Sequence, residues 1–255
     1  RIHINYIGEI IYLIYFILMI GARALGMYEG TVSYTVVLVI AMILFAVKMI
    51  ITSHTVKEYG IAAVLLAVAV LVYLHTGEKG LIVCFTMMLG MKEVNKYKVF
   101  KFATVTSAVC VIFRIITGVF GILPEKYYPQ LRDGAGLMFR HALGYVHPNT
   151  LHINVLMLTM LIGFTLTSVF VHLRESEEGS GESIGSKYTL YLAIISALLF
   201  AFNLYVFAYS GSRTGLLTSF VYLAFNLWFF VRRRLEVFEK TICFAAYPGV
   251  CLIAL

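Results

Sequence analysis

The sequence predicts an all-α, polytopic membrane protein. Of its 255 residues, 61% are hydrophobic and only 13% are charged, an apolar share well above that of an ordinary soluble domain. The apolar residues form long continuous runs separated by short polar stretches, and roughly 20 such residues let one helix cross the hydrocarbon core. We therefore expect a bundle of about 8–9 spans in one integral membrane domain over residues 1–255.

The order of the spans follows from the apolar runs. The third and fourth are short, "IAAVLLAVAVLVYL" and "LIVCFTMMLGM", with only "HTGEKG" between them. They predict a tilted pair or a re-entrant hairpin, and either leaves the chain on the same side. The chain lacks an initial methionine and stops within an apolar run, so we expect it to be cut at both ends. The spans are expected at residues 4–20, 33–52, 59–75, 80–92, 102–123, 151–173, 188–209 and 214–231, with a ninth from 241.

The orientation of the spans follows from lysine and arginine, which gather in cytoplasmic loops. One set of alternate loops holds most of them, including "KEVNKYK" (92–98) and "RRRLEVFEK" (232–240). The acidic, Gly/Ser-rich segment 174–187 lies in the same set and predicts a flexible cytoplasmic linker. The long loop 124–150 and "YSGSRTG" (209–215) then both face outward.

Composition also excludes several function classes. The formal net charge is +7, but the basic residues sit mainly in loops, where topology explains them without nucleic acid. The four cysteines lie inside apolar runs without CxxC or Cys/His spacing, so they predict packing residues rather than metal ligands. We expect no metal site and no cofactor.

The loop 124–150 is the first candidate site, because a long loop rich in Gly, Pro and Tyr is often functional. Its stretch "LMFRHAL" (137–143) predicts a short interfacial helix, and it carries Arg140. Arg132 and Arg140 can bind an anionic substrate, or they can simply bind lipid headgroups at the membrane surface.

The turn "GSRTG" around Arg213 is the second candidate. Ser212 or Thr214 can cap the helix that follows. A helix N-terminus with an arginine beside it suits an anion, because amide and guanidinium donors both point toward it. A plain interhelical turn is the alternative. Since Arg140 and Arg213 are expected on one side of the bilayer, they can converge on a pyrophosphate, which arginine binds bidentately.

Two polar residues occur inside or at the edge of apolar runs. Arg114 is about 13 Å from the outer end of its span at 1.5 Å per residue, so it faces the protein interior or a water-filled cavity, or else it snorkels to the headgroups. His152 begins a span, and a hydrogen-bonded structural role is the better prediction for it.

The outer loop also contains candidate bases. A neutral imidazole of His141 or His147 can accept a proton. The loop carboxylates Glu125 and Asp133 are rival bases, or merely solvated groups. Asn149 follows His147-Pro148 and predicts a turn that starts a helix at residue 150.

Two motifs together resemble a known family. "FRHALGYVHPNTLHINVLMLTMLI" (139–162) is followed some two spans later by "YSGSRTGLLTSFVYL" (209–223). This pattern resembles the O-antigen ligase and Wzy-type polysaccharide polymerase superfamily, bacterial inner-membrane glycosyltransferases with a GT-C-like helical fold. The resemblance covers residues 135–230 well and the preceding helices only as hydrophobic spans.

The resemblance implies a mechanism at the outer face of the bacterial cytoplasmic membrane. An acceptor sugar hydroxyl would attack a glycan linked to undecaprenyl pyrophosphate, without metal, and other polysaccharide assembly proteins would be partners beside the lipid bilayer. We expect a polymerase rather than a ligase; ligases of the superfamily place a further histidine in a later outer loop, beyond Leu255. The predicted catalytic residues are Arg140, Arg213, His141 and His147, and the predicted substrate-binding residues are Arg114, Arg132, Asn149, Ser212 and Thr214.

Two other classes fit parts of the pattern. A flippase or transporter for a lipid-linked oligosaccharide would line a path with arginines, but it predicts internal repeats, and the sequence has no convincing repeat. A non-catalytic lipid-binding scaffold would tolerate Arg140→Lys, whereas an enzyme that uses a bidentate fork would not.

Overall fold

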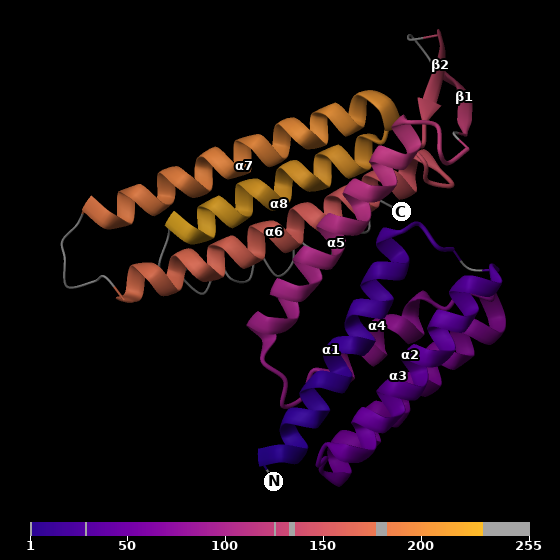
Figure 1. Cartoon of the computed structure of the whole chain (residues 1–255), viewed down its shortest axis with the longest axis vertical. Helices are drawn as coiled ribbons and strands as arrows, with labels where there is room; N and C mark the ends of the chain where they lie inside the picture. The colour runs from indigo at the N-terminus through magenta and orange to yellow at the C-terminus, as the bar shows by residue number, and fades with distance from the viewer. Residues whose placement is uncertain (1, 29, 125, 133–135, 177–182, 232–255) are drawn as a thin grey trace. The chain divides into compact units, whose positions relative to one another are not determined.

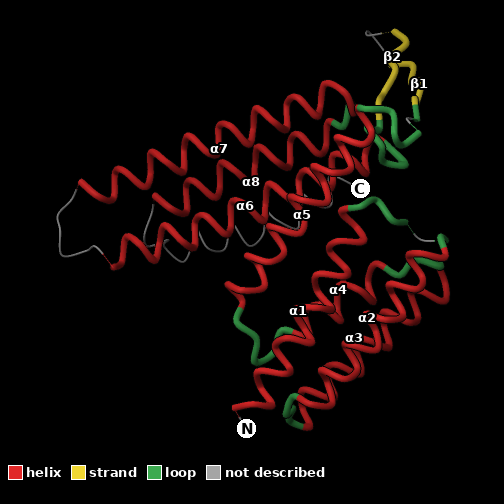
Figure 2. The backbone as a smooth tube through the Cα atoms, in the orientation of Figure 1, coloured by secondary structure: helices red, strands yellow, loops and turns green. Residues whose placement is uncertain are grey.

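The computed structural model describes residues 2–28, 30–124, 126–132, 136–176 and 183–231 (Figure 1). These residues form eight helices and one two-stranded sheet (Figure 2). In chain order the elements are α1 (Ile2–Ala24), α2 (Val32–Ile51), α3 (Val56–Thr76), α4 (Gly80–Gly90), α5 (Lys96–Val119), β1 (Tyr127–Arg132), β2 (Gly136–His141), α6 (Pro148–Ser176), α7 (Ser183–Ser210) and α8 (Arg213–Val231).

The prediction of an all-α polytopic bundle is confirmed. Within the described ranges, seven helices are long and apolar enough to cross a membrane. The exception is α4, in the run at 80–92 for which a tilted span and part of a re-entrant hairpin were both expected alternatives. Its 11 residues cover about 16 Å, roughly half the thickness of the hydrocarbon core. The expected ninth span from residue 241 lies outside the described residues.

The chain divides into two compact units, with the boundary between Val111 and Ile112 inside α5. Each is described by itself below. The prediction of a single integral domain over residues 1–255 stays a prediction.

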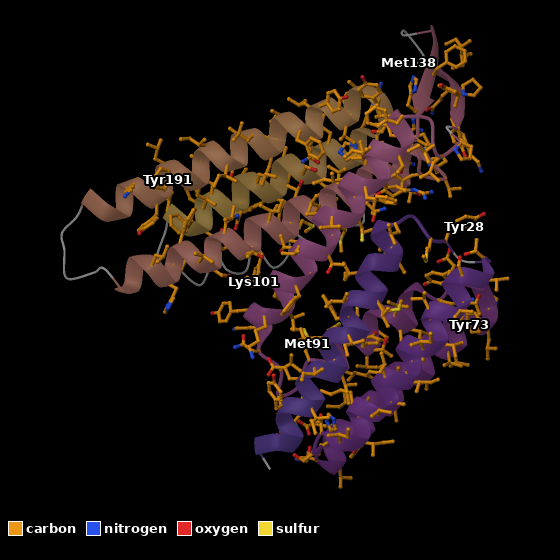
Figure 3. All side chains as sticks on the ribbon, viewed as in Figure 1. Tyr28, Tyr73, Met91, Lys101, Met138 and Tyr191 are labelled. Atoms are coloured by element: carbon orange, nitrogen blue, oxygen red, sulfur yellow. The ribbon has the colours of Figure 1, made fainter. Side chains whose placement is uncertain are left out.

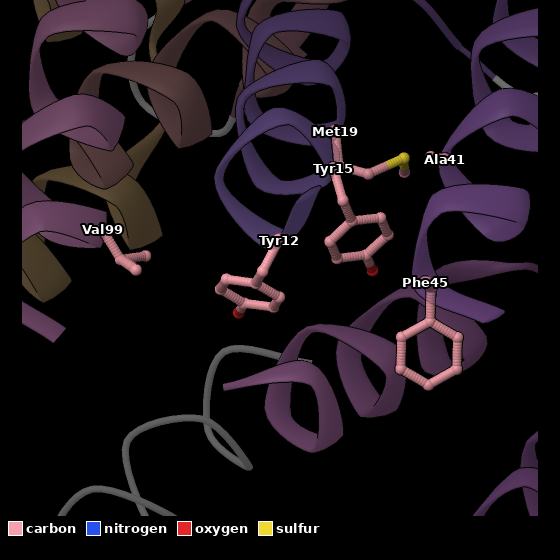
Figure 4. Packing of buried hydrophobic residues seen from close by; sticks show 6 residues of the cluster. All are labelled: Tyr12, Tyr15, Met19, Ala41, Phe45 and Val99. Atoms are coloured by element: carbon pink, nitrogen blue, oxygen red, sulfur yellow. The ribbon is translucent and has the colours of Figure 1, made fainter. Parts of the chain in front are cut away.

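The first unit has its core between α1, α2 and α4 (Figure 4). Buried tyrosines need a partner for the hydroxyl, and α4 supplies both partners. Tyr12 donates to the Met87 carbonyl at 2.6 Å, and the Tyr15 hydroxyl lies 2.7 Å from that of Thr86. Gly90 leaves room for the Tyr12 ring, which a Cβ at this position would overlap. The short helix α4 is therefore held by specific contacts despite its length.

A polar cluster shows where the chain returns after α4. Lys48, near the end of α2, is buried, and its Nζ donates to the Lys92 carbonyl at 3.0 Å. The Lys92 Nζ in turn lies 2.6 Å from Oε2 of Glu58, in the first turn of α3. Residue 92 therefore lies at the same end of the unit as the α2–α3 junction. This agrees with the expectation that the third and fourth apolar runs return the chain to the side on which they begin.

The second unit contains α6, α7 and α8, which run side by side (Figure 1). Polar side chains join them inside the bundle. Asn203 of α7 donates to Thr159 of α6 at 2.8 Å and accepts from Ser219 of α8 at 2.7 Å. Tyr222 of α8 donates to the Met160 carbonyl at 2.8 Å. Hydrogen bonds of this kind fix which faces of apolar helices meet.

The helices also extend into the predicted linker 174–187. Helix α6 continues to Ser176 and α7 already begins at Ser183. The central part, residues 177–182, lies outside the described residues.

The loop 124–150 contains a β-hairpin where a short helix had been predicted for 137–143. β1 and β2 pair antiparallel, with Tyr128 opposite Arg140 and Leu131 opposite Leu137. Successive side chains alternate between two faces of a strand, and the sequence "GLMFRH" separates Leu137 and Phe139 from Met138 and Arg140. The helix prediction was wrong because this stretch is too short for a helical period to compete with cross-strand pairing.

The two faces of the hairpin differ in character. We define the site face as Tyr128, Gln130, Met138 and Arg140, and the apolar face as Tyr127, Pro129, Leu131, Leu137 and Phe139, with His141 at its base opposite Tyr127. On the site face, the Tyr128 hydroxyl donates to the Val146 carbonyl at 2.6 Å, which ties the hairpin to the segment that enters α6.

Candidate functional site

The turn between α7 and α8 forms the base of the candidate site. Helix α7 ends at Ser210, and Gly211 follows with φ of 61°, a left-handed conformation that glycine adopts without strain. The Gly211 amide donates to the Phe207 carbonyl at 2.7 Å. Helix α8 then begins at Arg213. The end of one helix and the start of the next are thus separated by two residues.

Arg140 is brought to this turn from 70 residues earlier in the chain. Its Nε donates to the Ser210 carbonyl and one terminal nitrogen donates to Oδ1 of Asn149, both at 2.5 Å. The other terminal nitrogen lies 3.3 Å from Oε1 of Gln130. The guanidinium is therefore oriented by three separate segments, and Arg140 and the predicted turn around Arg213 do converge.

The ends of α7 and α8 carry opposite partial charges at this turn. The Ser210 carbonyl belongs to the last turn of α7, where partial negative charge accumulates and a cation is stabilised. The first turn of α8 carries the opposite partial charge, and its amides point away from the helix. Arg213 is exposed at that position. The turn therefore holds one arginine at a helix C-terminus and presents another beside a helix N-terminus.

The residues around Arg213 take positions close to those predicted. Ser212 is buried and precedes the helix, and its carbonyl accepts from the Leu216 amide at 3.2 Å. Thr214 is exposed within the first turn rather than before it. Of the two predicted caps, Ser212 occupies the cap position.

His147 caps helix α6. The helix begins at Pro148, two residues earlier than expected, and proline suits the first helical position because it has no amide to satisfy. Nδ1 of His147 accepts from the Asn149 amide at 3.1 Å, and its carbonyl accepts from Leu151. Sequence reasoning could not find this role, since histidine is not a preferred N-cap.

The cap position constrains His147 as a base. With Nδ1 accepting a hydrogen bond, the neutral ring carries its proton on Nε2, so the ring can take another proton only by giving up the cap. Burial first, and Arg140 second, lower the pKa of His147 below its usual range. The ring is therefore neutral at pH 7, and its Nδ1 keeps the capping hydrogen bond at the start of α6.

His141 has a different setting, between two tyrosine rings. Its ring centroid lies 5.0 Å from that of Tyr127 and 5.8 Å from that of Tyr209, both edge-on. These contacts attach the end of β2 to the last turn of α7. Among the predicted histidine bases, His141 is the one whose ring does not cap a helix.

His152 lies beneath the turn and is fully buried. Its Nδ1 lies 3.1 Å from the hydroxyl of Ser210, which also accepts from the Ser212 amide at 3.3 Å. A Cβ at Gly215 would overlap the His152 ring, so α8 approaches α6 closely here. The expected structural role of His152 agrees with these contacts: it supports the residue whose carbonyl holds Arg140.

Arg114 is half-buried and lies against Tyr145 of the loop. Its guanidinium carbon lies 5.7 Å from the centroid of the buried Tyr145 ring, within cation–π range. Among the described residues its Nε is buried without a hydrogen-bond partner. Gly118 and Gly144 allow the backbone of the loop to lie directly on α5. The contact of Arg114 with Tyr145 does not join it to Arg140 or Arg213.

Three predicted residues cannot be placed. Nothing is described of the Arg132 side chain, and Glu125 and Asp133 lie outside the described residues. Over the ranges that the structure describes, no group of three or more His, Cys, Asp or Glu residues is arranged to hold a metal ion. Sequence reasoning missed Gln130 and Tyr128, which only strand alternation in 127–141 places on the face of Arg140.

No protein-family model, curated protein or solved structure matches the chain.

Proposed function

We propose that the protein transfers a glycan from an undecaprenyl-pyrophosphate-linked donor to a sugar hydroxyl, at the outer face of the bacterial cytoplasmic membrane. The observation that carries the proposal is the hydrogen bond from Arg140 to the Ser210 carbonyl at the α7–α8 turn. Ser210 lies three residues before the exposed Arg213. This arrangement offers two cations and a helix N-terminus to one anion. The GT-C-like fold belongs to the same proposal and rests on the motif resemblance.

The chemistry needs charge stabilisation more than it needs a nucleophile from the protein. In the transfer, the acceptor oxygen bonds to the anomeric carbon while the bond from that carbon to the pyrophosphate oxygen breaks. The bonding electrons leave with the pyrophosphate, and donors already oriented toward it lower the barrier. Arg140, whose three nitrogens donate to the protein, would stabilise one phosphate mainly by its positive charge, and Arg213 with the first turn of α8 would bind the other.

The acceptor hydroxyl must also lose a proton. Of the two histidines in the loop, we assign this role to His141, because His147 has its Nδ1 lone pair engaged in the α6 cap. Neither histidine needs to be charged beforehand, since a general base acts in its neutral form. Asn149 positions Arg140 through its side-chain oxygen, and Ser212 shapes the turn.

The product distinguishes the variants of this proposal. A polymerase joins repeat units to one another, whereas a ligase of the same superfamily joins a finished glycan to a different acceptor by the same bond changes. Other polysaccharide assembly proteins would supply the donor. A flippase would use the same anion site without breaking a bond.

The test compares polymer chain length in cells that carry the full-length protein with Arg140→Lys or Arg213→Lys, at equal membrane abundance. Arg23→Lys is the matched control, since Arg23 is also exposed and ends a helix on the same predicted side. We expect loss of long polymer while single lipid-linked repeats remain accessible from outside. Unchanged polymer in both variants would refute the site, and loss of the accessible single repeats would favour the flippase.

A further inference from the structure

The apolar face of the β-hairpin is exposed although it lies beyond the spans. Leu131 is 78% exposed, Phe139 60%, Leu137 59% and Tyr127 56%. Figure 3 shows the side chains around the labelled Met138 clear of the helices. The hairpin lies outside the predicted spans along the chain, since α5 ends at Val119 and β1 begins at Tyr127. Lipid around the spans therefore does not explain its exposed apolar side chains. A soluble surface rarely leaves so many large apolar groups together.

The direction of the strands bears on what can cover this face. In Figure 1 the strands run crosswise to α6, α7 and α8 and extend past the edge of α7. If the strands continued the helix direction, Leu137 would lie about 13 Å beyond His141 at 3.3 Å per residue, farther than the roughly 5–8 Å thickness of the interfacial layer on each side. A crosswise hairpin instead stays at one depth along the axis of the bundle.

The segment between α5 and the hairpin is apolar and exposed as well. Val119, Phe120 and Ile122, which lead from α5 toward the hairpin, are 61%, 76% and 72% exposed. Lys126, just before β1, is exposed and provides a cation at the level of phosphate headgroups. Tyrosine, present at the base of both faces, is a residue typical of membrane interfaces.

We infer that the hairpin lies along the outer membrane surface with Leu131, Leu137 and Phe139 of its apolar face inserted among the lipids, while His141, at the base of that face, stays against Tyr209 of α7. The site face then points away from the lipid, toward the contacts of Arg140 with Ser210 and Asn149. In this position the bilayer sets the depth of Arg140, at the headgroup layer. The inference does not depend on the proposed glycan transfer.

The experiment uses two cross-strand pairs on opposite faces of the same strands. Leu131 and Leu137 pair on the apolar face, and Gln130 and Met138 pair on the site face. Each is replaced singly by cysteine in full-length protein whose native cysteines are replaced by alanine, labelled with an NBD fluorophore, and reconstituted into phosphatidylcholine vesicles. Quenching by lipids brominated in the acyl chain is compared with quenching by aqueous iodide.

We expect bromolipid quenching at positions 131 and 137 to exceed that at 130 and 138 at least threefold, with iodide quenching in the reverse order. Equal quenching by bromolipid at all four positions would overturn the two-faced arrangement. Protection of 131 and 137 from both quenchers would mean that protein covers the face, and would overturn insertion, as would free access of iodide to them.

A second reporter keeps the test decisive if cysteine removal prevents folding. Trp228 is the only tryptophan in residues 1–255, so Trp228→Phe, together with Phe in place of any tryptophan outside this range, gives a silent background. Leu131→Trp and Gln130→Trp in that background differ by one residue and by face. Stronger bromolipid quenching of Leu131→Trp supports insertion, and equal or weaker quenching refutes it.

Discussion

Asn149→Asp tests whether the charge of Arg140 matters, because it changes charge without changing shape. The Asn149 side-chain oxygen accepts from Arg140 at 2.5 Å. An aspartate at the same place keeps this acceptor and adds a full negative charge beside the guanidinium. If Arg140 serves an anion, the substitution should weaken that anion's binding even though Arg140 stays in position.

The size of the effect follows from Coulomb's law. An anion bound to the far edge of the guanidinium would lie about 5–6 Å from the new carboxylate, a repulsion of about 3 kcal/mol at an effective dielectric constant near 20 and below 1 kcal/mol in bulk water. Since Asn149 is exposed, solvent screening places the value between these limits. We expect pyrophosphate to bind about 5–100-fold more weakly, with a smaller difference at high salt.

The assay is titration of purified, reconstituted protein with inorganic pyrophosphate at low and high salt. Asn149→Ala removes the hydrogen bond without adding charge and should weaken binding less than Asn149→Asp does. Asn95→Asp is the matched control at a helix-capping asparagine of the first unit, where its Oδ1 accepts from the Tyr97 amide. Equal loss in the alanine and aspartate variants, or loss in the Asn95 control, would refute the electrostatic reasoning.

Three further predictions concern packing and pH. Gly118→Ala should lower stability by about 1–3 kcal/mol, because the new Cβ would overlap loop backbone that cannot move aside, whereas Gly60→Ala, with nothing within 4 Å, should be neutral or stabilising; melting temperatures in detergent decide. Asn203→Leu removes two interhelical hydrogen bonds and should lower the free energy of unfolding by only about 1 kcal/mol. A decrease of several kcal/mol in that free energy would contradict this value. Because folding lowers the pKa of His147, the stability that this residue contributes is present above pH about 6.5 and lost as the pH falls below it; an unchanged pH profile of unfolding in His147→Gln would contradict it.

The helices could be predicted from sequence because each depends mainly on its own apolar run. The weak prediction was α4, where an 11-residue helix is held by hydrogen bonds from Tyr12 and Tyr15 of α1, far away in the chain. Apolarity alone does not distinguish such a helix from a short span. Helix ends also moved, since α6 begins at Pro148 and not at residue 150.

The candidate site could be predicted only in part. Arginines in loops predicted to face outward suggested Arg140 and Arg213, and the predicted topology allowed the two to lie on one side. The partners of Arg140 could not be found this way, because a backbone carbonyl at Ser210 leaves no compositional trace. The hairpin was missed for a related reason: alternation over six residues is weak until a second strand is known to pair with it.

The separation of Arg140 and Ser210 along the chain also has a consequence for biogenesis. During synthesis, the hairpin and its arginine emerge before α6 and α7, and the carbonyl that receives Arg140 is made 70 residues later. Until α7 is in place, the guanidinium has no helix terminus to bind, and the outer loop cannot reach its final conformation. A chain interrupted between α6 and α7 would therefore contain every residue of the loop but not the formed site. The site can form only after the helices that follow the loop have been inserted.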